Sequence, residues 1–120
     1  MLIRYNTEDL GKEFKKLAAQ IGAYYSINAE KIVDVIDARF ELTEAGRKKL
    51  VGNVEATTNT DGSKTYVKDD GTVKITENMD GTTTIEWTGT EAHIGNKDNQ
   101  EDPAWERKIG VVAKADFIGG

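Results

Sequence analysis

The chain is 120 residues long, which is enough for one hydrophobic core and too short for two independent ones. It has no cysteine, which excludes disulfides, thiolate metal sites and a thiol nucleophile. The formal net charge is −5, and residues 52–120 carry seven Lys/Arg against thirteen Asp/Glu. Because a DNA- or RNA-binding surface needs positive charge, this excess of acid disfavours a nucleic-acid partner.

The chain begins MLIRYNTEDL, with only three residues before the first charge, and no apolar run has signal-peptide or membrane-spanning length. We expect synthesis in the cytoplasm and no membrane contact. Leu, Ile, Val and Phe make up only 26 of the 120 residues, so the predicted core is thin. A thin core is often completed by a neighbouring subunit, and we therefore expect a protein partner or a homo-oligomer.

The N-terminal segment has the pattern of an amphipathic helix. Asn6 can cap free backbone N–H groups, and acidic residues follow it in the first turn. Apolar residues then recur at helical spacing until Gly22, at Leu10, Phe14, Leu17 and Ile21. The pattern predicts a helix that ends near Gly22.

The next segment, NAEKIVDVIDARFEL, fits two structures. As a helix starting at Asn28 it places Ile32, Val33, Ile36 and Phe40 on one face. As a strand, its second half alternates apolar residues (Ile36, Ala38, Phe40, Leu42) with charged ones (Asp37, Arg39, Glu41). The longer apolar stripe and the capping asparagine favour a helix up to about residue 40, followed by a turn or short helix at residues 44–49.

The middle of the chain repeats Asp-Gly three times, at residues 61–62, 70–71 and 80–81. Asp-Gly between alternating segments is a strong hairpin signal, because Gly adopts positive φ without penalty. Three such turns predict a four-stranded meander.

The alternation of apolar residues also predicts the register of that meander. A three-residue loop at Gly81 pairs Ile75 with Ile85 and Val73 with Trp87. The same loop at Gly71 pairs Val67 with Val73, and a two-residue loop at Asp61-Gly62 pairs Ala56 with Val67. The predicted inner face is Val54, Ala56, Val67, Val73, Ile75, Ile85 and Trp87, and the outer face is rich in Thr and charge.

The sequence offers little for chemistry. Aligned to a calcium loop, the Asp-Gly segments lack the first and last ligands, so we expect no metal. His93 is the only histidine, serine occurs only at positions 26 and 63, and no phosphate-binding or dinucleotide motif is present. We therefore assign no catalytic residue, cofactor or metal ligand, and expect a protein that is not an enzyme.

Two groups of residues remain as candidate contacts. The basic cluster Arg47, Lys48 and Lys49 is a weak candidate for binding an anion. The C-terminal segment alternates, and a strand there would place Ile109, Val111, Ala113, Ala115 and Phe117 on one side as a candidate interface. This strand could cover one edge of the sheet or add to the sheet of a neighbouring molecule.

We predict an α+β fold with N-terminal amphipathic helices packed on an antiparallel β-meander with Asp-Gly hairpins, plus a C-terminal strand. Residues 1–120 would form a single domain, mainly helical over 1–51 and mainly β over 52–120. The expected function is that of a non-enzymatic structural or assembly protein, such as a component of a phage virion or injection machine. The alternative is a small acidic inhibitor or adaptor, of the phage counter-defence or immunity type, that binds a partner protein or small ligand.

Overall fold

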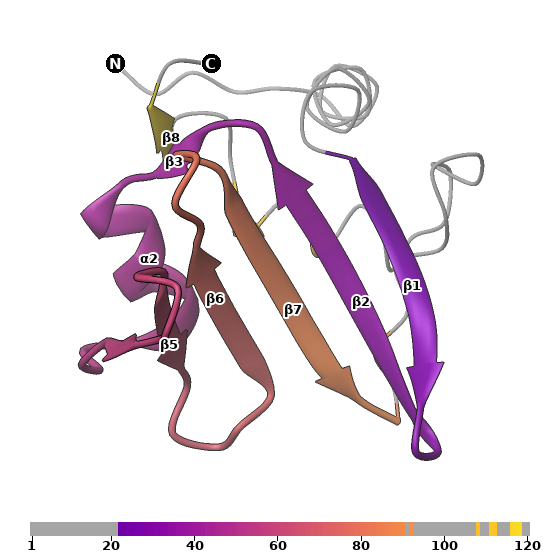
Figure 1. Cartoon of the computed structure of the whole chain (residues 1–120). Helices are drawn as coiled ribbons and strands as arrows, with labels where there is room; N and C mark the ends of the chain where they lie inside the picture. The colour runs from indigo at the N-terminus through magenta and orange to yellow at the C-terminus, as the bar shows by residue number, and fades with distance from the viewer. Residues whose placement is uncertain (1–21, 91, 93–107, 109–110, 113–115, 119–120) are drawn as a thin grey trace, which may run out of the picture.

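The computed structural model describes residues 22–90, 92, 108, 111–112 and 116–118, which form mostly antiparallel β-structure (Figure 1). The main sheet has six strands in the order β1-β2-β7-β6-β5-β4. These strands are β1 (Ala23–Asn28), β2 (Lys31–Ala38), β4 (Thr57–Thr58), β5 (Lys64–Val67), β6 (Val73–Glu77) and β7 (Thr83–Gly89). A second sheet pairs β3 (Glu41–Leu42) with β8 (Phe117–Ile118), and the helix described over its full length is α2 (Glu44–Val51).

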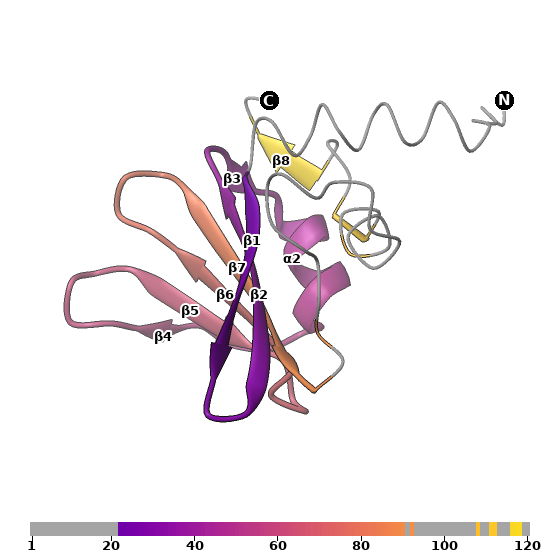
Figure 2. The ribbon, with the colours of Figure 1, turned by 90° about the vertical axis from the view of Figure 1, so that its right-hand side faces the viewer.

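The described elements are arranged in two layers. Seen along the sheet, α2 and β8 lie on one side of the six strands, and the β4–β5 and β6–β7 loops project to the other side (Figure 2). The opposite surface of the sheet is covered by no described helix or strand. The core that the described elements build therefore lies on one face of the sheet.

The predicted helix over residues 28–40 is wrong, and this overturns the predicted packing of N-terminal helices on a meander. The segment forms the end of β1 and the whole of β2, which is eight residues long. Half of β2 is Ile or Val, and these β-branched residues favour an extended backbone. The predicted helix before Gly22 lies outside the described residues.

The turn between β1 and β2 is made by residues with no turn signature. Ala29 and Glu30 both have positive φ, at 49° and 69°, as a two-residue hairpin loop of the I′ type requires. Such loops usually contain Asn or Gly, because a side chain in this conformation is strained. Because no turn residue marks this hairpin, the local sequence pattern predicts the start of a helix here instead.

The segment at residues 44–49, expected to be a turn or a short helix, lies in helix α2. Thr43 caps it, because the Thr43 hydroxyl accepts a hydrogen bond from the Gly46 backbone N–H at 3.1 Å. Gly52, with a φ of 80°, ends the helix by donating its N–H to the Lys48 carbonyl. Leu50 and Val51 point from α2 into the core.

The meander β4-β5-β6-β7 is confirmed, and so is the register of its last hairpin. Ile75 lies opposite Ile85, and Val73 lies opposite Trp87. Gly81 has a φ of 87° and donates its N–H to the Asn78 carbonyl, as the three-residue loop requires. The side-chain pattern was therefore sufficient to predict the position of this turn.

The registers predicted for the other two hairpins are each wrong by one residue. At Gly71 the Lys68 N–H bonds to the Val73 carbonyl, so the loop is one residue longer and Tyr66 faces Ile75. This places the larger Tyr66 ring in the core, beneath the Arg47 guanidinium at 4.5 Å, and leaves Val67 46% exposed. Burying a tyrosine ring removes more apolar surface from water than burying a valine.

The first hairpin uses a three-residue loop in place of the predicted two-residue one. Asn59 donates its N–H to the Ser63 carbonyl and accepts from the Gly62 N–H, so Thr57 pairs with Thr65. A two-residue loop would need positive φ at Asp61 as well, and the structure avoids this strain by using only Gly62. Ala56, predicted to face inward, precedes β4 and is exposed.

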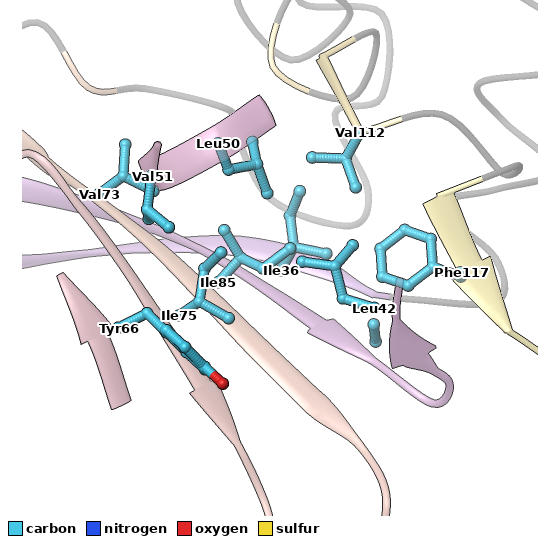
Figure 3. Packing of buried hydrophobic residues seen from close by; sticks show 11 residues of the cluster. Ile36, Leu42, Leu50, Val51, Tyr66, Val73, Ile75, Ile85, Val112 and Phe117 are labelled. Atoms are coloured by element: carbon cyan, nitrogen blue, oxygen red, sulfur yellow. The ribbon is translucent and has the colours of Figure 1, made fainter. Parts of the chain in front are cut away.

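The core lies between the sheet and α2, where the side chains of Ile36, Ile75 and Ile85 meet Leu50 and Val51 (Figure 3). The three isoleucines are completely buried. Val112 and Phe117 close one side of the cluster. Trp87 and Val54, both predicted to face inward, are half-buried and pack against it.

Candidate functional site

The candidate site is the face of the six-stranded sheet opposite α2, which we call the polar face. Successive side chains of a strand point to opposite sides, so the residues between the core positions point to this face. In the half of β4–β7 nearer the β4–β5 and β6–β7 loops these residues are small and polar, whereas Val67, Lys74 and Glu86 occupy the other half of the same face. The small polar residues form one group. We call them the hydroxyl array: Thr57, Asn59, Ser63, Thr65, Thr76, Asn78, Thr82 and Thr84.

Strand register aligns the threonines of the array in a row across four strands. Thr57 pairs with Thr65, Thr65 with Thr76, and Thr76 with Thr84. On the next strand, Asp37 pairs with Thr84. A second row, two residues nearer the loop tips, contains the two asparagines and their hydroxyl partners.

The array is built from two copies of one unit, with the sequence T-x-N-x-D-G-(S/T)-x-T. The first copy runs from Thr57 to Thr65 and the second from Thr76 to Thr84. The hydrogen bonds of the two copies are also the same. Asn59 Nδ2 donates to the hydroxyls four and six residues later at 3.0 and 2.8 Å, and Asn78 Nδ2 does so at 3.0 and 3.2 Å.

The aspartate of each Asp-Gly pair holds its own loop. Asp61 Oδ1 accepts from the N–H and the hydroxyl of Ser63, and Asp80 Oδ1 does the same with Thr82. Asp70 repeats the contact in the middle hairpin. The hydroxyl bonds, followed by the backbone N–H bonds, lower the pKa of all three carboxyl groups below the ordinary value of 3.8. The aspartates thus act in turn structure and are not arranged to bind a metal.

The hydrogen bonding continues from the array to the other end of the sheet. Thr84 Oγ1 donates to Asp37 Oδ1 at 3.1 Å, and the Tyr24 hydroxyl lies in the electrostatic field of the same carboxylate. Burial, and then the charge of Asp37, raise the pKa of Tyr24 above its ordinary value of 10.0. Both asparagines of the array, their hydroxyl partners and Asp37 are therefore held in place by hydrogen bonds within the chain.

The strand positions of the polar face have no net charge. They contain two lysines, Lys31 and Lys74, and two carboxylates, Asp37 and Glu86. Lys74 Nζ and Glu86 Oε2 are 3.7 Å apart across β6 and β7. In a chain with a net charge of −5, this face is electrostatically neutral.

The basic cluster predicted as an anion contact lies on α2, away from the polar face, and each of its members has an acidic neighbour. Arg47 and Lys48 lie 3.9 and 3.1 Å from the Glu44 carboxylate, and Lys49 lies 3.4 Å from that of Asp116. An incoming anion would have to compete with these carboxylates.

Of the residues predicted as a C-terminal interface, the structure describes Val111 and Phe117, and these two do not lie in one strand. Phe117 pairs with Leu42 in the same chain, and its side chain belongs to the core. Val111 is 40% exposed and has helical backbone. Ile109, Ala113 and Ala115 lie outside the described residues, as does His93.

The described residues also form an ion pair on the α2 side of the sheet and a cavity. Asp34 is fully buried on the α2 side of the sheet and lies 2.8 Å from Lys108 Nζ, an ion pair that ties residue 108 to β2. A cavity of about 280 Å³ opens at the loop tips, lined by Glu41, Gly62, Lys64, Glu77, Asn78, Met79, Gly81 and Thr82.

Among the described residues no cluster of three or more His, Cys, Asp or Glu could hold a metal ion. The described helical segment is also too short and too polar to cross a bilayer.

Comparison of the chain with protein-family models, with curated proteins and with solved structures returned no match. The sequence did contain a signal for this site, because the unit T-x-N-x-D-G-(S/T)-x-T occurs twice, 19 residues apart. Attention to the Asp-Gly pairs alone missed the asparagines and hydroxyls around them.

Proposed function

We propose that this chain is a non-enzymatic assembly protein that joins a larger complex through its polar face. The observation that carries the proposal is the hydroxyl array, a prearranged and uncharged surface that spans four strands. The α2 side of the sheet, by contrast, is occupied by the core of the chain itself.

The physical support is the low cost of binding through such a surface. Ordering a long charged side chain at an interface costs about 0.5–1.5 kcal/mol in lost rotamer freedom. Thr, Ser and Asn are short, and in the array Asn59 and Asn78 already bond to their neighbours. Little conformational freedom remains to be lost when a partner covers this face.

The lack of charged residues in the array also fits a protein contact. The centres of protein–protein interfaces are depleted in charged residues, and binding loops of antibodies are rich in Tyr, Ser and Asn. The array has no charged member, and Tyr24 and Val67 add exposed apolar surface beside it. A phosphate-binding or catalytic surface would instead need charge or a titratable group, which the array lacks.

The test is the native size of the full chain in extracts of its source, compared with the 13.2 kDa of one chain. We expect the chain to elute in a larger complex and the double variant Thr65→Lys/Thr76→Lys to leave it. The matched control is Ala45→Lys/Thr58→Lys, which adds the same charge at exposed positions on the α2 side.

Equal elution of the wild type and the polar-face variant would contradict the proposal. A one-to-one complex with an unrelated protein that survives the polar-face substitutions would favour the inhibitor or adaptor alternative. The thermal unfolding of each variant should be measured in parallel, so that loss of the complex is not confused with loss of the fold.

A further inference from the structure

We infer that the partner of the polar face is a second copy of this chain, packed face to face across a twofold axis. This inference rests on the proposed function and identifies the occupant of the same surface. It depends on three properties of the face: its hydrogen-bonding capacity, its charge and its size.

The hydrogen-bonding groups of the array are complementary to themselves. A hydroxyl both donates and accepts, whereas an ammonium group only donates and a carboxylate only accepts. Thr57, Thr65, Thr76 and Thr84 form an uninterrupted row of hydroxyls. Twofold packing places like surfaces together, so it requires a surface that can bond to its own copy.

The charge distribution points to the same occupant. Two copies, each with a net charge of −5, repel one another, and like charges brought into an interface cost several kcal/mol. The strand positions of the polar face avoid this cost, because Lys31 and Lys74 balance Asp37 and Glu86. A basic protein partner would gain more by binding an acidic surface than by binding this neutral one.

The size of the face predicts a weak but specific dimer. The six strands are on average about five residues long. With about 4.8 Å between strands and about 3.3 Å per residue, they give about 500 Å² of sheet surface per copy. Two copies would bury about 1,000 Å², near the lower limit for a specific interface. Sheets that pack in this way lie about 10 Å apart with their strands rotated by about 30°. We therefore expect association that depends on concentration.

The test uses the purified full chain and two oppositely charged variants, Thr65→Lys/Thr76→Lys and Thr65→Glu/Thr76→Glu. Mass is measured by light scattering after size exclusion, up to about 1 mM because the interface is small. The wild type should approach twice 13.2 kDa, and each variant alone should remain at 13.2 kDa. An equimolar mixture of the two variants should recover the doubled mass, and it should lose that mass at high salt.

Recovery in the mixture would exclude misfolding as the reason for dissociation, because misfolded chains would not reassociate. A wild type that stays at 13.2 kDa at the highest concentration would overturn the inference, as would a mixture that fails to associate while the wild type is dimeric. If the purified chain is monomeric but its complex in source extracts still requires the array, the second-copy inference fails and the proposed function stands. If that complex does not require the array, the proposed function fails as well.

Discussion

Gly46 provides a test of the packing between α2 and the chain that closes over it. Replacing a helical Gly by Ala normally stabilises a protein by about 1 kcal/mol, because Ala has the higher helix propensity. At Gly46 an added Cβ would lie 2.7 Å from Asp116 Cβ and 3.0 Å from Leu42 Cδ1. Carbon atoms pack at about 3.5–4.0 Å, so one of the two segments must move by about 1 Å.

The segment at Asp116 cannot move without losing a hydrogen bond. Its carbonyl accepts the Thr43 N–H at 2.6 Å, and the new Cβ would also lie 3.2 Å from that oxygen. Overpacking of this kind costs about 1–3 kcal/mol, which exceeds the propensity gain. We predict that Gly46→Ala lowers the free energy of unfolding by about 1 kcal/mol, with an upper limit of about 2 kcal/mol.

The assay is a urea titration of Gly46→Ala beside Ala45→Gly, an exposed position in the same helix. Ala45→Gly should cost about 1 kcal/mol through propensity alone. Both substitutions are therefore expected to destabilise, although they change propensity in opposite directions. A Gly46→Ala variant that is more stable than the wild type would refute the close packing of Asp116 on α2.

Three further substitutions or conditions test other parts of the fold. Glu30→Gly should increase the free energy of unfolding by about 0.5–1 kcal/mol and so raise the urea midpoint, because relief of strain at positive φ exceeds the entropy cost of glycine. An unchanged midpoint would contradict the positive-φ turn at Glu30. Ile75→Ala, at a fully buried site, should cost about 2–5 kcal/mol in the same titration, whereas Val67→Ala on the exposed face should cost far less; similar losses would mean that the register is wrong. Because the folded pKa values of Asp61, Asp70 and Asp80 are lowered, their contribution to stability is complete above 3.8 and is lost as the pH falls through the folded values. Acid unfolding of a triple Asp→Asn variant should therefore depend less on pH below 4 than that of the wild type, and identical acid transitions would argue against these bonds.

The parts of the fold that could be predicted are those with strong local signals. Gly81 between two alternating segments determined a loop and a register, because a slip of one residue would have exposed Ile75 and Ile85. The short helix after Thr43 was likewise recognisable. These features depend on neighbouring residues and need no knowledge of the rest of the chain.

The parts that failed depend on distant contacts. Tyr66 replaces Val67 in the core because Arg47, from another element, covers its ring. Likewise, β2 is a strand because it pairs on both sides, with β1 and with β7. Neither contact can be read from local periodicity. The candidate site was partly predictable, since the outer face was expected to be rich in Thr, but its repeated hydrogen bonds required the register of all four strands.

The duplicated hairpin gives this protein an internal reference for physical measurement. Asn59 and Asn78 occupy the same position in the repeated unit and donate to hydroxyls at the same spacing, yet β4 is at the margin of the sheet while β6 has a strand on either side. The hydrogen-bond pattern is thus the same while the surroundings differ. Amide hydrogen exchange rates at the two loops can therefore be compared within one protein. The difference would report how much extra protection against local opening a hairpin gains when it lies inside the sheet and not at its margin.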